Sequence, residues 1–186
     1  MPMLMLKDLP RYECLLEGAR QNPDLDPSAC EAFLTLLRTG DEVFGVVERR
    51  LSEHNLSQGR FSVLMLLWKV CARAPESGCA TPARPPTPAE LAEAAGVTRA
   101  TMTGLVDTLE RDGLVRREPD PNDRRMMWVQ LTPKGEALIK EMLPLHFRMM
   151  ACLMQPLSET ERKTMVKLLN KVLEQASGQR APAQPN

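Results

Sequence analysis

Arginine and threonine side chains gather in two short stretches of the sequence, residues 98–103 and 116–124. An arginine can form a bidentate pair with guanine, and a threonine can contact a base, a thymine methyl group or a phosphate. Backbone N–H groups at the start of a helix also favour a phosphate. These residue types predict a surface that binds duplex DNA. Its candidate residues are Thr98, Arg99, Thr101, Thr103, Arg116 and Arg124.

The sequence shows no pattern typical of a metal site, a cofactor site or a catalytic site. The five cysteines are scattered and odd in number, and only two histidines are present, so no zinc-site spacing occurs. Walker, GxGxxG and GxSxG motifs are also missing from the sequence. We therefore expect no metal, no cofactor and no enzymatic activity. The alternative is an enzyme with a cysteine nucleophile and His54 or His146 as its base, which would need an orienting third group that no motif indicates.

The overall charge is neutral, with 24 basic and 24 acidic residues. Affinity for DNA rests largely on basic side chains that meet phosphates, so neutrality argues against a nucleic-acid protein. The distribution matters more, because residues 114–134 contain five basic and three acidic residues. The longest apolar run, Val63 to Trp68, is too short to span a membrane, and the N-terminus lacks the pattern of a secretory signal. We expect a cytoplasmic globular protein.

The elements that must position these side chains can be predicted from their caps and periodicity. Apolar residues recur at helical spacing over 27–53 and 57–72, and a proline-rich loop follows over 73–87. Thr87 and Glu90 form a capping box for a short helix that Gly96 ends. Thr98 then caps a second helix that runs to Asp112.

After this second helix the apolar period changes from helical to alternating. LVRRE and MMWVQL predict two strands joined by the turn-rich residues 119–122. Two further helices follow, the last one begun by a capping box at Ser158 and Glu161. The predicted fold is mainly α with a small β wing, a winged helix-turn-helix. Its predicted parts are a leader and dimerisation helix over 1–56, the winged domain over 57–135, dimerisation helices over 136–178 and a disordered tail over 179–186.

Residues 96–138 closely resemble the MarR family of transcription regulators. The wing signature is present as Asp123-x-Arg125, followed by Val129-x-Leu131-Thr132 and Gly135. The resemblance implies that Arg125 enters the minor groove and that Asp123 holds this arginine in place. It also implies a homodimer in which the first and last long helices intertwine, so that two recognition helices read a palindromic operator. We therefore expect a DNA-binding regulator that represses transcription.

The layout is most similar to the urate-responsive branch of this family, but most ligand residues of that branch are not kept. Its acidic ligand falls on Ser62 and its recognition-helix arginine on Gly104, while the wing arginine is kept as Arg117. The family resemblance implies instead a small aromatic or phenolic anion that releases the protein from DNA. The candidate effector-binding residues are Tyr12, Arg60, Phe61, Met65, Trp68 and Arg117.

Thiol oxidation is the alternative signal. Cys30 lies close to the place where the peroxide-sensing branch carries its reactive cysteine. A reactive thiol needs a positive charge nearby, and no lysine or arginine lies within four residues of Cys30, whose neighbour is Glu31. Tyrosine partners of that branch are also missing, since Tyr12 is the sole tyrosine. Cys71 and Cys79, which flank the proline-rich loop, are a separate candidate pair.

Overall fold

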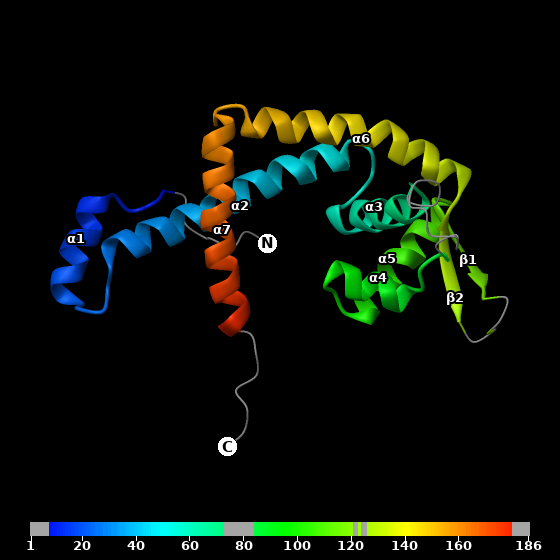
Figure 1. The fold of residues 1–186 in the computed structure, drawn as a ribbon, viewed down its shortest axis with the longest axis horizontal. Helices are drawn as coiled ribbons and strands as arrows, with labels where there is room; N and C mark the ends of the chain where they lie inside the picture. The colour runs from blue at the N-terminus through cyan, green and yellow to red at the C-terminus, as the bar shows by residue number, and fades with distance from the viewer. Residues whose placement is uncertain (1–7, 73–83, 121–122, 124–125, 180–186) are drawn as a thin grey trace, which may run out of the picture. The chain divides into compact units, whose positions relative to one another are not determined.

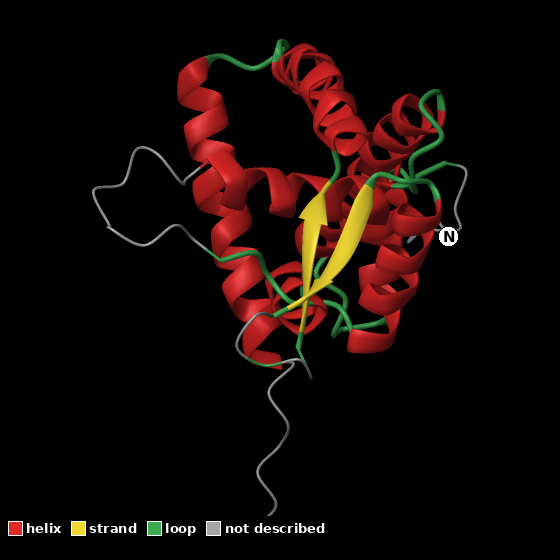
Figure 2. Ribbon diagram, turned by 90° about the vertical axis from the view of Figure 1, so that its right-hand side faces the viewer, coloured by secondary structure: helices red, strands yellow, loops and turns green. Residues whose placement is uncertain are grey.

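The computed structural model describes residues 8–72, 84–120, 123 and 126–179, with the side chains of 70–72 excepted. The chain divides into two compact units, Met1–Ile139 and Lys140–Asn186, which we describe separately. Figure 1 shows the order of the elements, and Figure 2 shows that the two strands form a narrow ribbon among helices. The elements are α1 Tyr12–Gln21, α2 Pro27–Ser52, α3 Gln58–Ala72, α4 Pro88–Ala95, α5 Arg99–Arg111, β1 Val115–Pro119, β2 Met127–Leu131, α6 Pro133–Met154 and α7 Glu159–Gln179.

The helices begin where the capping residues predict. Asp26 accepts hydrogen bonds from the backbone N–H groups of Ser28 and Ala29 at the start of α2, and these bonds, that of Ala29 foremost, hold the pKa of its carboxyl below the usual value. Thr87 and Glu90 form the complete capping box of α4. Gly96 ends α4 with a φ of 65°, a left-handed conformation that costs glycine little. The predicted helix starts are therefore confirmed.

The winged part of the first unit has one continuous apolar core. Its fully buried side chains come from α3, α4, α5, both strands and the beginning of α6, so the core joins every element of the winged fold. The larger ones are Leu64, Leu67, Met102, Val106, Leu109, Val115, Val129 and Ile139. This arrangement confirms the predicted fold class, a mainly helical chain with a two-stranded β wing.

The wing is an antiparallel hairpin in which Val115 pairs with Leu131 and Pro119 with Met127. Val115, Val129 and Leu131 are buried, while their neighbours along each strand are more exposed, as the two-residue period of a strand requires. The N–H of Val129 donates to the carbonyl of Pro86 at 2.9 Å. The segment that leads into α4 is thereby hydrogen-bonded to the wing.

A tight joint connects the end of α5, the wing and the start of α6. The Thr132 hydroxyl donates to the Gly113 carbonyl at 2.7 Å, and the Lys134 ammonium donates to the Asp112 carbonyl at 2.8 Å. Gly135 lies so close to this turn that a Cβ there would overlap the Leu114 carbonyl oxygen. Glycine is therefore required at this position by the close approach of the backbone.

The second unit consists of the rest of α6 and α7. Helix α6 continues through Pro144, and the Ser158–Glu161 capping box starts α7 as predicted, with 2.7 Å from the Ser158 N–H to the carboxylate. No described residue of α7 is buried, and five of its large apolar side chains are exposed. None of the helices within the described residues has the length and apolar character that a membrane span requires.

Candidate nucleic-acid interface

Helix α5 has one buried face and one exposed face. Met102, Val106 and Leu109 are completely buried, and Leu105 is half-buried above Gly59 of α3. This spacing of three and four residues anchors one side of the helix in the core. The predicted DNA-binding residues Arg99, Thr101 and Thr103 lie on the exposed remainder, together with the cap residue Thr98.

The threonines of this face also stabilise the helix. The Thr98 hydroxyl oxygen accepts from the Thr101 N–H at 3.1 Å and lies 2.9 Å from the Thr101 hydroxyl. The Thr103 hydroxyl donates to the Arg99 carbonyl at 2.9 Å. The Thr101 and Thr103 hydroxyls each keep a lone pair that could still accept a hydrogen bond. Thr98 thus has a structural role as the cap, whatever it contacts in addition.

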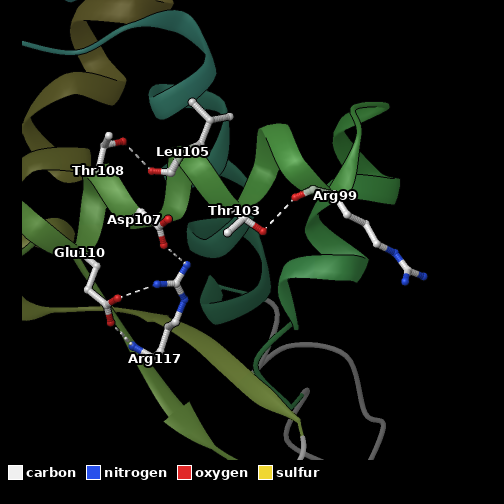
Figure 3. A network of polar contacts seen from close by, with 7 residues as sticks. All are labelled: Arg99, Thr103, Leu105, Asp107, Thr108, Glu110 and Arg117. Atoms are coloured by element: carbon white, nitrogen blue, oxygen red, sulfur yellow. Dashed lines mark hydrogen bonds and ion pairs between the residues drawn. The ribbon is translucent and has the colours of Figure 1, made fainter.

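Arg99 differs from Arg60, Arg116 and Arg117, which all pair with carboxylates. Its guanidinium has no ion pair with any described residue, and Figure 3 shows it extending away from the polar cluster at the other end of α5. An exposed, unpaired guanidinium in the first turn of a helix keeps all its donors available to an acceptor outside the chain. Arg99 can therefore contact a base or a phosphate without first breaking an ion pair.

Arg116 lies in β1 and is already engaged. Its Nε is 3.0 Å from a Glu118 carboxylate oxygen, and its Nη2 donates to Gln130 Oε1 at 3.2 Å. The side chain is largely exposed, so this pair is weak and easily exchanged for a phosphate.

Arg117, its neighbour in β1, points back toward α5 (Figure 3). Its guanidinium donates to Glu110 Oε2 at 2.7 Å and to Asp107 Oδ1 at 2.6 Å, and its backbone N–H donates to Glu110 Oε1 at 2.9 Å. The two carboxylates were not among the predicted site residues. Their spacing of three residues, which puts both on one side of a helix, is the signal that could have found them.

The wing tip is described only in part. Arg124 and Arg125 lie outside the described residues, and so does the predicted pair between Asp123 and Arg125. The Asp123 N–H donates to Asp120 Oδ1 at 3.2 Å, and the Met126 N–H donates to the Asp123 carbonyl at 2.9 Å. Asp123 thus takes part in the turn that joins the two strands.

The predicted effector residues are placed in three different elements. Phe61 is buried in α3, with Met65 and Trp68 half-buried one and two turns further along the same helix. Tyr12, 39% exposed, lies in α1, which packs on α2. Figure 1 shows α1 beside the first turns of α2, at the opposite end of that helix from α3. The structure therefore brings the α3 residues together but leaves Tyr12 apart.

Arg60, also predicted to bind the effector, joins three elements. Its guanidinium pairs with the Asp112 carboxylate just after α5, and its Nη1 donates to the Asn55 carbonyl between α2 and α3 at 2.9 Å. Its Nε is buried without a hydrogen-bond partner. Both arginines of the predicted effector set thus hold carboxylates of α5 or of the residue that follows it.

Comparison with known proteins agrees with this geometry. The family model described as "MarR family" matches residues 79–127. The HTH-type transcriptional repressor YetL of Bacillus subtilis is 34% identical, over 92% of this chain and 96% of its own. The structure of a MarR mutant from E. coli in complex with operator DNA superposes with a TM-score of 0.65 at 24% identity, over 81% of this chain and 99% of that one.

A further structure, of Bordetella bronchiseptica BpsR, has a TM-score of 0.59 at 25% identity, over 76% of this chain and 98% of that one. Its description concerns the regulation of BpsR DNA binding by 6-hydroxynicotinic acid. These relatives are transcription regulators and not enzymes. The long, nearly full-length identity to YetL and the family model over the helix-turn-helix lead to one assignment. The chain belongs to the MarR family of winged-helix, DNA-binding transcription regulators.

Proposed function

We propose that this chain is a repressor that binds a palindromic DNA operator as a homodimer. The observation that carries the proposal is the exposed surface of α5, where the unpaired Arg99 lies one turn before Thr103 and where Thr101 is exposed as well. Helix α5 follows α4 after a three-residue turn, and the second helix of such a pair is the one that enters the major groove. YetL is named a transcriptional repressor, which supports repression, and not activation, as the role of this chain.

The homodimer is supported by apolar surface that each unit leaves open. Phe33 and Phe44 of α2 are at least half exposed, and in α7 the residues Val166, Leu169 and Leu173 form a stripe at helical spacing. Such stripes mark interaction surfaces, because their exposure to water is unfavourable. A second copy that covers them would present two α5 helices to successive major grooves, about 34–36 Å apart.

We further propose that a small aromatic or phenolic anion releases the protein from its operator. BpsR, whose DNA binding is described as regulated by a hydroxylated aromatic acid, supports this class of effector. Phe61, Met65 and Trp68 offer apolar and aromatic surface on α3 for the ring. Because Arg60 and Arg117 already hold carboxylates, an anionic effector would have to compete with those ion pairs for a guanidinium.

Cys30 carries the alternative, a redox signal. It is half-buried in the first turn of α2 and follows the cap residue Asp26. Operator binding before and after mild peroxide distinguishes the two mechanisms. If peroxide releases the wild type, reductant restores it and Cys30→Ser does not respond, the small-molecule proposal is wrong.

The decisive experiment for the main proposal is selection of bound sequences from a random duplex pool. We expect the selected sequences to contain an inverted repeat, bound with an affinity that falls steeply as salt rises. Arg99→Ala should cost about 1–3 kcal/mol on the best sequence and relax the preference at one position per half-site. Arg20→Ala in α1 is the control. Equal affinity of the wild type for selected and scrambled duplexes would overturn the proposal.

A further inference from the structure

Arg117 joins the root of the wing to the second half of α5. It makes three hydrogen bonds to this helix, two from the guanidinium and one from the backbone, at 2.6 to 2.9 Å. Its side chain is only 21% exposed, so these charged bonds are partly shielded from water. Figure 3 shows the guanidinium lying between the two carboxylates and pointing away from solvent-directed Arg99.

The carboxylates that Arg117 holds would otherwise hinder DNA binding. Helix α5 carries two basic residues, Arg99 and Arg111, and two acidic ones, Asp107 and Glu110, so the helix alone is neutral. Asp107 is 56% exposed and follows Thr103 by four residues, which puts the two on the same side of the helix. A carboxylate on that side would face the phosphates of a bound duplex and repel them.

We propose that Arg117 is a positioning residue for DNA recognition in this chain. Its guanidinium holds the wing root at a fixed place against α5 and neutralises Asp107 and Glu110, so that the helix can approach phosphates. It acts through the helix and does not itself touch DNA. The planar, forked guanidinium suits this role because it can hold two carboxylates at once, which an ammonium group does less well.

This inference rests on the proposed DNA-binding function, and a double-mutant cycle tests it. The proteins are the wild type, Arg117→Gln, the pair Asp107→Asn with Glu110→Gln, and the combination of all three substitutions. Each is titrated against the duplex selected from the random pool and against a scrambled duplex, and circular dichroism checks the fold. The matched control is Arg116→Gln in both backgrounds, because Arg116 is adjacent in β1 but pairs within the wing.

We expect Arg117→Gln to weaken binding of the selected duplex about tenfold or more in the normal background. Where the two carboxylates have been neutralised, the same substitution should change affinity less than about threefold, because residues that interact show such non-additivity. Arg116→Gln should cost the same factor in both backgrounds. The variant with both Asp107→Asn and Glu110→Gln should bind the scrambled duplex more tightly than the wild type does. It should also discriminate less between the two duplexes, because Arg117 then no longer holds the wing root.

Two results would overturn the inference while the proposed function stands. One is an Arg117→Gln protein that binds like the wild type; the other is an equal loss in both backgrounds, which would mean that Arg117 contacts DNA directly. If Arg117→Gln does not fold, Arg117→Lys replaces it, because lysine keeps the positive charge. The lysine variant must still discriminate less between the selected and the scrambled duplex, and the salt dependence of its DNA binding must equal that of the wild type. A lysine variant that is identical to the wild type overturns the inference as well. A wild type without sequence-dependent binding overturns the proposed function, and this inference with it.

Discussion

In the winged part of the chain, α5 buries Met102, Val106 and Leu109 completely, whereas α7 buries none of its described residues. Both helices are amphipathic, and both carry enough apolar side chains for a core. The difference is that α5 finds its packing partners within its own chain, in α3, α4 and β1. An isolated helix is only marginally stable in water, so α7 depends on packing that its own unit does not supply. The core of the winged part is therefore self-sufficient, and the α7 surface is where the proposed second copy would pack.

The largest effect should come from placing charge on the exposed stripe of α7. Leu169→Glu with Leu173→Glu would put two carboxylates into the proposed dimer interface, where their desolvation is costly. We expect the dimer to dissociate at least about a hundredfold more readily and operator affinity to fall with it, measured by sedimentation and by duplex titration.

Lys171→Glu, on the opposite side of α7, is the control and should leave the dimer intact. A double variant that still sediments as a dimer would show that this stripe is not the interface. A wild type that sediments at the 20.8 kDa of one chain would show the same.

Truncation inside the winged core should have the next largest effect. Leu109 is completely buried, so Leu109→Ala should lower the free energy of unfolding by about 2–5 kcal/mol. If the winged part is self-sufficient, this cost should be the same in the wild type and in the α7 double variant, because distant sites add. Urea denaturation followed by circular dichroism measures both values. A loss of unfolding free energy that appears only in the dimer would show that the core of the winged part depends on the second copy.

Gly135→Ala tests the joint between the wing and α6. A Cβ at this position would overlap the Leu114 carbonyl oxygen, so the backbone must shift to accept it. We expect a loss of about 1–3 kcal/mol in unfolding free energy, the usual cost of overpacking. Gly178→Ala in the last turns of α7, where a Cβ meets no atom within 4 Å, is the matched control. Equal melting temperatures for the two variants would refute the close approach.

The smallest expected effect is a gain. Gly104 lies in the middle of α5, exposed, and a Cβ added there would meet no atom within 4 Å. Gly104→Ala should therefore raise the free energy of unfolding by about 0.5–1 kcal/mol, through the lower backbone entropy of the unfolded chain. Thermal unfolding without DNA measures this gain. A lower melting temperature would mean that this face of α5 is packed in a way that the exposed fraction does not reveal.

The elements that could be predicted from the sequence are those whose signals are local. The caps satisfy N–H groups three residues away, so the pattern and the structure coincide; they are Thr87 with Glu90, Thr98, and Ser158 with Glu161. Gly96 ends α4 for a similar reason, since a left-handed residue is needed there. The fold class followed from these caps and from the change of apolar period at Leu114.

The partners of the arginines could not be predicted in the same way. Arg60 pairs with Asp112, which is 52 residues away, and this contact exists only once α3 and α5 have packed. Arg117 and Glu110 are closer in sequence, but the α5–β1 turn decides whether they meet. Resemblance to the urate-responsive branch suggested an effector role for Arg117, and that role remains a prediction. The structure adds the carboxylates with which any anion must compete.

The joint at Thr132 and Gly135 has a mechanical consequence. Three hydrogen bonds connect the start of α6 to the turn that follows α5. The Thr132 N–H donates to the Leu114 carbonyl, the Thr132 hydroxyl to the Gly113 carbonyl, and the Lys134 ammonium to the Asp112 carbonyl. Gly135 also packs directly on that turn, which leaves no space between the turn and the start of α6. Because a close-packed contact of this kind transmits displacement instead of absorbing it, a displacement of the first turn of α6 is passed to the end of α5. The first turn of α6 and the end of α5 therefore move together as one rigid body.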